Sequence, residues 1–319
     1  MKVLRFVQPK LKALSNGLFA NWMPGDAVEV GDFGTVVDCQ FNRLGSIRDY
    51  GADFEVTEAL AGNTELEYKD KLNVSINALG SAAAGKNQGA KVKLDLTDKG
   101  SFLYHLSNIR QRRPANTKVF NEQIARVIFG GGLDFPKDGV LITEIQRADH
   151  ATIIVSEEQG GKLELKTDFK PTGTAFLSGA SGGISTSFSH GSLFSFVGQD
   201  DIAALIKIVI PKMSPTNGPN NALAAAAAQA IEIVKDWMRE HRVGAQHLRI
   251  SYDPAVPDGA IINFEGHEQS FTMQLEDMSA AELLETVAEV QPESVTEEEP
   301  FKLDIEEQEV ETKGRQAYG

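Results

Sequence analysis

The stretch from residue 72 to residue 96, LNVSINALGSAAAGKNQGAKVKLDL, contains two runs in which apolar and polar residues alternate. The apolar positions used here are Leu72, Val74 and Ile76 in the first run and Val92 and Leu94 in the second. A period of two places successive side chains on opposite faces of a strand. The stretch therefore predicts two strands, each with one apolar face, joined by a connection of small residues.

A second segment, residues 151–197, has the same character: two alternating parts flank a stretch rich in glycine and serine. Its apolar strand positions are Ile154, Leu163, Leu165 and Phe188. Both segments exceed the ~5–6 residues of a usual globular strand. Each is long enough to supply the ~9–11 residues with which a strand crosses a bilayer. An ordinary twisted sheet with one wet face produces the same alternation, so both interpretations stay open at this point.

The rest of the chain predicts an α+β fold, with a central, twisted, mostly antiparallel sheet, peripheral helices and a smaller mixed C-terminal region. Strands are expected at 27–41, 102–109, 139–145, 150–157 and 202–210. A helix is expected from Asn116, a good N-cap, to Phe129, and another over 223–241. Three short strands are expected between residues 247 and 276.

Proline, asparagine and glycine cluster at 211–221, PKMSPTNGPNN, and predict a linker there. We therefore expect a β-rich domain over 1–211 and a C-terminal region over 222–290 made of a helix and a small β region. Residues 291–319 are rich in glutamate and poor in aromatic residues, and we expect a disordered acidic tail.

The charge of the chain is concentrated near its C-terminus. The 319 residues carry a net charge of −14, and residues 276–319 carry −11 of it. An acidic chain repels phosphate backbones, so nucleic acid is not an expected partner. The tail is either a solvated, flexible segment or a cover for a basic surface.

Several further features point to a cytoplasmic protein. Cys39 is the single cysteine, which excludes an internal disulfide framework and a cysteine-based zinc site. No apolar run reaches the ~18 residues of a transmembrane helix. The N-terminus meets charge and Pro9 too early for a secretory apolar region.

The N-terminal stretch interleaves cations with apolar residues. We single out as candidate lipid contacts four cations and two aromatic residues: Lys2, Arg5, Lys10, Lys12, Phe19 and Trp22. Cations meet anionic headgroups, and aromatic residues lie at membrane interfaces. The alternative is that this element packs on the core, with Pro9 causing a kink or a late helix start.

Two short motifs are typical of enzymes, but neither has the required context. Residues 80–86 fit a phosphate-binding loop, yet Asn87 stands where a hydroxyl should reach magnesium, and a strand follows instead of a helix. Ser181 lies in a G-x-S-x-G pattern that a strand also follows. The six histidines lack metal-ligand spacing. We therefore expect no enzymatic activity, no cofactor and no metal.

The order of these elements resembles the gasdermin family, particularly its bacterial members. The resemblance covers about residues 1–211. It rests on the basic N-terminal element, the two alternating segments, the helix NEQIARVIF between them and the loop RLGSIRDYG. It implies that the two segments, 72–97 and 151–197, refold into membrane-spanning hairpins of a giant barrel pore. Two features depart from the family: there is no cysteine close to the N-terminus, and about a hundred residues follow the matching part.

From this resemblance we expect an autoinhibited pore-forming effector that permeabilises membranes and causes cell death, an antiviral defence if the host is bacterial. Its expected partners are anionic lipid, further copies of itself and an activating protease. The protein would move from the cytoplasm to the inner face of the membrane. Cleavage is expected in the acidic tail or in the linker, at Pro211, Ser214, Asn217 or Gly218. The competing hypothesis is a soluble, non-enzymatic β-rich adaptor or regulatory protein.

Overall fold

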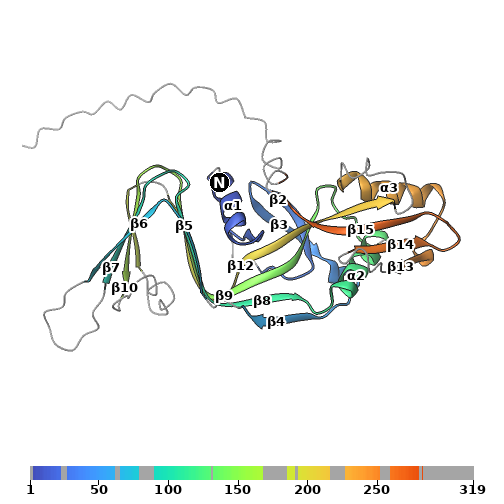
Figure 1. Cartoon of the computed structure of the whole chain (residues 1–319), viewed down its shortest axis with the longest axis horizontal. Helices are drawn as coiled ribbons and strands as arrows, with labels where there is room; N and C mark the ends of the chain where they lie inside the picture. The colour runs from blue at the N-terminus through green and yellow to red at the C-terminus, as the bar shows by residue number, and fades with distance from the viewer. Residues whose placement is uncertain are drawn as a thin grey trace, which may run out of the picture.

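The computed structural model describes residues 3–22, 27–61, 65–78, 90–130, 132–167, 185–190, 193–215, 227–251, 259–279 and 282. A large, mostly antiparallel sheet with few helices dominates the described part of the chain (Figure 1). The predicted α+β class is therefore confirmed.

The main sheet has the strand order β13-β14-β15-β12-β9-β2-β3, and β8 joins it beside β9. Two further strands, β4 and β5, pair with β8, and the short β1 pairs with β12. The bounds are β1 Phe19–Ala20, β2 Asp32–Val37, β3 Gln40–Ser46, β4 Val56–Leu60, β5 Glu65–Asp70, β8 Phe102–Pro114, β9 Val140–Ser156, β12 Leu193–Pro215, β13 Leu248–Ser251, β14 Gly259–Phe264 and β15 Ser270–Asp277. Strand β9 is continuous where the sequence predicted two strands.

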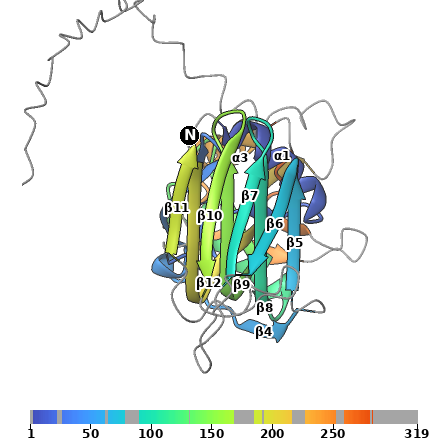
Figure 2. The ribbon, with the colours of Figure 1, turned by 90° about the vertical axis from the view of Figure 1, so that its left-hand side faces the viewer.

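A second, four-stranded sheet has the order β11-β10-β7-β6. Its strands lie side by side in Figure 2. They are β6 Leu72–Ala78, β7 Ala90–Leu96, β10 Gly161–Thr167 and β11 Ser185–His190. The two alternating segments of the sequence therefore form strands, as their period predicted.

The helices of the described residues are α1 Leu4–Leu14, α2 Thr117–Phe129 and α3 Ala227–Glu240, with 3-10 turns η1 Ile47–Tyr50 and η3 Ala245–His247. Helix α2 begins as predicted, because the Asn116 side chain accepts hydrogen bonds from the backbone N–H groups of Lys118 and Val119. Helix α1 includes Pro9, so the late start that this proline suggested is not observed.

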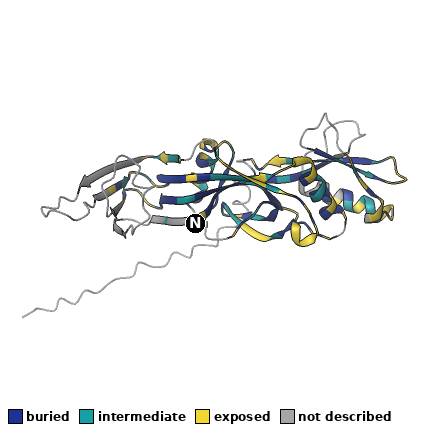
Figure 3. Ribbon diagram, turned by 90° about the horizontal axis from the view of Figure 1, so that it is seen from below, coloured by how far each residue is buried: buried dark blue, intermediate teal, exposed yellow. Residues whose placement is uncertain are grey.

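The buried side chains form one main core that follows the length of the main sheet (Figure 3). Helix α1 contributes Leu4, Val7 and Leu11 to it, and α2 contributes Phe120 and Ile124. These residues recur at helical spacing, which explains why one face of each helix packs on the sheet.

The structure corrects the domain boundary expected at Pro211. Strand β12 continues through Pro211 and Ser214 to Pro215 and pairs there with β15, with Pro211 opposite Leu275. The pairing of β12 with β9 ends at Val209, so beyond this residue β12 is paired on one side only. A proline, which has no N–H to donate, is therefore tolerated at position 211. The C-terminal strands thus extend the main sheet. Asn217 and Gly218 lie outside the described residues.

Candidate functional site

Strands of the main sheet continue into the second sheet in an unchanged order. The main sheet places β12, β9, β8 and β5 side by side, and the second sheet places β11, β10, β7 and β6 side by side. Along the chain, β5 is followed by β6, β7 by β8, β9 by β10, and β11 by β12, so each strand of the second sheet is directly connected to one strand of the main sheet. We call the second sheet with these connections the fold-over. The described connections, at residues 71, 97–101 and 157–160, form its bend line.

The pairing register of the second sheet aligns the residues that the sequence singled out. Val74 is opposite Leu94, Leu94 is opposite Leu163, and Leu163 is opposite Phe188, so these four positions form one row across the sheet. Two residues further along the strands, Ile76, Val92 and Leu165 form a second such row. Charged positions alternate with these rows: Lys93 is opposite Glu164, and Asp95 is opposite Lys162. Opposite charges in such positions favour this register.

The fold-over encloses a second group of buried apolar residues, separate from the main core. Leu94, Leu96, Leu103 and Ile154 are buried but do not belong to the main cluster. Leu103 alternates along β8 with main-core residues, so it faces the other side of the sheet. That is the side on which the second sheet folds back (Figure 1). Burial of these residues stabilises the folded-back position.

His105 lies on the same side of β8 as Leu103 and is 1% exposed. Its Nε2 is 2.9 Å from Oε1 of Glu65 on the neighbouring strand β5. Glu65 begins β5, so this contact ties β5 to β8 at the end of the strand away from the bend at residue 71.

Hydrogen bonds link the bends to one another. Thr97 donates its backbone N–H and its hydroxyl to the carbonyl oxygen of Lys71, at 3.2 and 3.1 Å. The ammonium of Lys71 lies 2.7 Å from a carboxylate oxygen of Asp98. Gly100 donates its N–H to the carbonyl oxygen of Ser156 at 2.9 Å. The three described bends therefore form one connected element.

Helix α1 packs directly on this bend line. Nζ of Lys10 lies 2.5 Å from Oδ2 of Asp70, the residue that ends β5. A Cβ atom added to Gly100 would lie 3.5 Å from Cβ of Phe6, so the helix and the second bend are in close contact. The helix thus touches two bends at once.

The other cations of α1 also face carboxylates. Arg5 pairs with Asp38 at 2.8 Å, between β2 and β3. Burial lowers the pKa of Lys12, although the nearby carboxylates of Asp277 and Glu282 act to raise it. In this conformation Arg5 and Lys10 are paired with the protein's own carboxylates, and Lys12 is only near two more. Lys2 lies outside the described residues.

The two aromatic residues that the sequence singled out as candidate lipid contacts are buried in this conformation. Phe19 is 3% exposed and Trp22 is 1% exposed, so neither faces solvent in this conformation. Trp22 packs edge-to-face on Tyr104, with ring centroids 5.9 Å apart, and its Nε1 donates to Oε1 of Gln8 at 2.8 Å. A large aromatic residue with a satisfied N–H is stable inside a core, which explains the burial.

The apolar residues that α1 exposes are different ones. Phe6 is 58% exposed and Leu14 is 51% exposed. Sequence reasoning missed them. The helical spacing of Leu4, Val7 and Leu11 places Phe6 off the buried face, whereas Leu14 continues that spacing and is exposed at the last residue of the helix. It also missed Asp70, whose signal is the charged run KDK at 69–71 that interrupts the alternation.

The two enzyme-like motifs, at 80–87 and 179–183, lie outside the described residues. Within the described ranges, no group of three or more acidic, histidine or cysteine side chains is placed to hold a metal. None of the described helices is long and apolar enough to span a bilayer.

No protein-family model matches this chain, and no curated protein matches it either.

Proposed function

We propose that this chain is a gasdermin-like pore-forming effector whose fold-over is the part that enters the membrane. The observation that carries the proposal is the register of the second sheet. It aligns Val74, Leu94, Leu163 and Phe188, from two segments far apart in sequence, in a single row. An apolar row flanked by charged positions is typical of strands with one face in lipid and the other in water.

The lengths of the strands support this proposal. The combined stretch of β7 and β8 covers residues 90–114, and that of β9 and β10 covers 140–167. Straightening at the bend line turns each pair into one strand that contains the ~9–11 residues needed to cross a bilayer. Pairing between copies in a closed barrel then satisfies every backbone N–H and C=O in lipid.

Helix α1 is the element that binds the membrane in this proposal. Anionic lipid competes with Asp38 and Asp70 for Arg5 and Lys10, because juxtamembrane cations gain ~1 kcal/mol each near an anionic surface. Exposed Phe6 and Leu14 add apolar contact. Departure of α1 uncovers the bend line. In this proposal the protein acts from the cytoplasm on the inner face of the membrane.

Proteolysis is the proposed trigger, with the cut between β12 and α3. A cut there leaves β15 and α3 held to β12 only by noncovalent contacts. The C-terminal region can then leave the main sheet and remove Asp277 and Glu282 from Lys12.

The test uses the full chain with a site for a sequence-specific protease inserted between Pro215 and Ala227. Dye-loaded vesicles of anionic phospholipid are mixed with the intact and with the cleaved protein. We expect leakage only after cleavage, only from anionic vesicles, and reduced by Arg5→Glu combined with Lys10→Glu. The matched control reverses two exposed cations away from α1 and the bend line, Lys118→Glu and Lys137→Glu.

Absence of leakage from the cleaved protein, with its circular dichroism spectrum unchanged, contradicts the proposal and favours the soluble adaptor. Leakage that the α1 and control variants reduce equally contradicts the role given to α1.

A further inference from the structure

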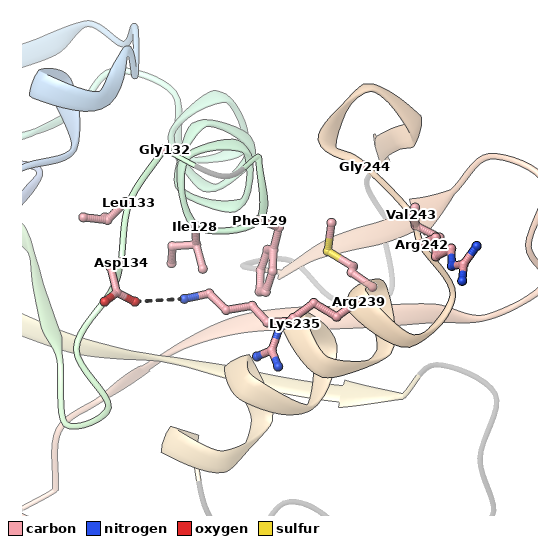
Figure 4. Close-up of a pocket in the computed structure, with 11 residues that line it drawn as sticks. Ile128, Phe129, Gly132, Leu133, Asp134, Lys235, Arg239, Arg242, Val243 and Gly244 are labelled. Carbon is pink, nitrogen blue, oxygen red and sulfur yellow. Dashed lines mark ion pairs between the residues drawn. The ribbon is translucent and has the colours of Figure 1, made fainter.

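A cavity of about 560 Å³ lies between the C-terminal ends of α2 and α3. None of the residues that line it belongs to the fold-over. Its volume is within the ~300–1,000 Å³ typical of ligand sites. Figure 4 shows side chains from α2, from the segment after it and from α3 facing this space. We call it the α2–α3 groove.

The groove combines an apolar floor with a cationic rim. Ile128, Phe129 and Leu133 supply the floor from the α2 side, and Met238 and Val243 supply it from the α3 side. Three cations line the rim, Lys235, Arg239 and Arg242. This combination suits an acidic segment that carries apolar side chains.

The rim cations are available to such a segment. Lys235 lies 3.5 Å from a carboxylate oxygen of the fully exposed Asp134 (Figure 4) and 3.6 Å from Glu232, which also lies 3.6 Å from Arg239. Both contacts of Lys235 are long for ion pairs and involve exposed carboxylates, so they are weak. Arg239 pairs at 2.7 Å with Asp236, one turn earlier in α3, and both side chains are more than 60% exposed. Within the described residues Arg242 has no ion-pair partner. Exposed pairs of this kind exchange readily for an incoming carboxylate.

The chain itself contains a segment of matching chemistry. Residues 294–311, SVTEEEPFKLDIEEQEVE, hold eight acidic residues and one basic residue. Within this segment Phe301, Leu303 and Ile305 alternate with charged residues. In an extended conformation that spacing turns the three apolar side chains to one side and the charges to the other.

A long stretch of chain joins this segment to the last described residue, Glu282. Eighteen residues, 283–300, separate Glu282 from Phe301. At about 3.3 Å for each extended residue they span up to ~60 Å.

We infer that the α2–α3 groove is the docking site of the acidic segment 294–311 of the same chain. Phe301, Leu303 and Ile305 occupy the apolar floor, and the flanking carboxylates face Lys235, Arg239 and Arg242. The acidic tail is then an intramolecular ligand of α3. This inference does not depend on the pore proposal, because its test needs no membrane.

The test compares hydrogen–deuterium exchange in the full chain and in a chain ending at Gln291, which keeps every described residue. We expect faster exchange at 127–130 and 235–244 without the tail. A synthetic peptide of residues 294–311, added to the shortened chain, restores the protection. The peptide with Phe301→Ser binds at least about tenfold more weakly, since a buried Phe side chain contributes more than a factor of ten in affinity.

Two variants distinguish binding by the cations that line the groove from nonspecific attraction between the acidic peptide and the protein. Arg239→Glu with Arg242→Glu weakens peptide binding, whereas Lys137→Glu, an exposed cation that does not line the groove, leaves it unchanged. Fluorescence anisotropy of labelled peptide measures both, and raising the salt from about 0.1 M to about 1 M weakens binding.

Unchanged exchange on shortening the chain, or a peptide that does not bind, overturns the inference. Docking from a second copy, seen as concentration-dependent dimerisation that requires Phe301, overturns the intramolecular assignment as well.

Discussion

Lys10 of α1 and Asp70 at the end of β5 are joined by an ion pair of 2.5 Å, sixty residues apart in the sequence. Asp70 precedes Lys71, which has a φ of 51° and turns the chain from the main sheet into the second sheet. The ion pair therefore ties the basic N-terminal helix to the bend on which the fold-over depends.

Removing this ion pair is expected to loosen α1 without unfolding the protein. Both side chains are partly exposed, so Asp70→Asn should change the free energy of unfolding by only about 0–1 kcal/mol. Hydrogen exchange of residues 4–14 should nevertheless become faster. The matched control is Lys69→Gln, which breaks a partly exposed pair with Glu67 and should leave α1 unchanged. Equal exchange in the two variants contradicts a tethering role for Lys10 and Asp70.

The enclosed apolar group should make a measurable contribution to stability. Leu94 is fully buried inside the fold-over, so Leu94→Ala should destabilise the protein by about 2–5 kcal/mol. Leu44 is 59% exposed, and Leu44→Ala should cost less than about 0.5 kcal/mol. Urea denaturation followed by circular dichroism measures both. A small effect at Leu94 means that the second sheet does not pack on β8 and β9.

Two glycines with nearly the same positive φ should differ in their tolerance of a side chain. Gly31 and Gly51 have φ values of 92° and 87°, so an alanine at either one should cost about 1 kcal/mol in backbone strain. A Cβ at Gly31 would lie 2.6 Å from Cζ of Phe54, whereas nothing lies within 4 Å at Gly51. Gly31→Ala should therefore cost a further ~1–3 kcal/mol from overpacking. Thermal denaturation of the two variants tests this difference.

Cys39 should give stability a dependence on alkaline pH. Burial raises the pKa of its thiol from 9.0 to about 11, because the thiolate loses hydration inside the protein. Between these values the unfolded chain releases the proton while the folded chain keeps it. Stability contributed by Cys39 is therefore complete below pH 9 and is lost as the pH rises toward 11.

The measurement for Cys39 is urea denaturation at several pH values. Cys39→Ala should remove this part of the decline between pH 9 and pH 11, and the native thiol should react slowly with thiol reagents at pH 8. Identical pH profiles for the two proteins contradict the assignment.

Local features of the sequence accounted for most of the secondary structure. Asn116 predicted the start of α2 because its side chain can accept from N–H groups that the helix leaves unpaired. Alternation predicted β6, β7, β10 and β11 because the faces of a strand have a period of two. These signals are short-range, so one segment is enough to show them.

Less of the candidate site could be predicted from the sequence. Its strand residues were singled out correctly as strand positions, but the pairing of β7 with β10, which aligns Leu94 with Leu163, joins segments about seventy residues apart. The partners of Arg5 and Lys10 come from other elements of the fold. No local pattern specifies which of several similar strands becomes a neighbour.

The sequence by itself determined the α+β class, the alternating strands and the acidic C-terminal segment, because period, capping and charge are properties of neighbouring residues. Only the tertiary structure decided that Trp22 is buried, that β12 continues through Pro211 to pair with β15, and that four strands fold back along one line. Those outcomes depend on contacts between residues far apart in the sequence. Trp22 is buried because Tyr104 packs against its ring and Gln8 accepts its N–H. Pro211 is tolerated in β12 because one side of the strand is unpaired there.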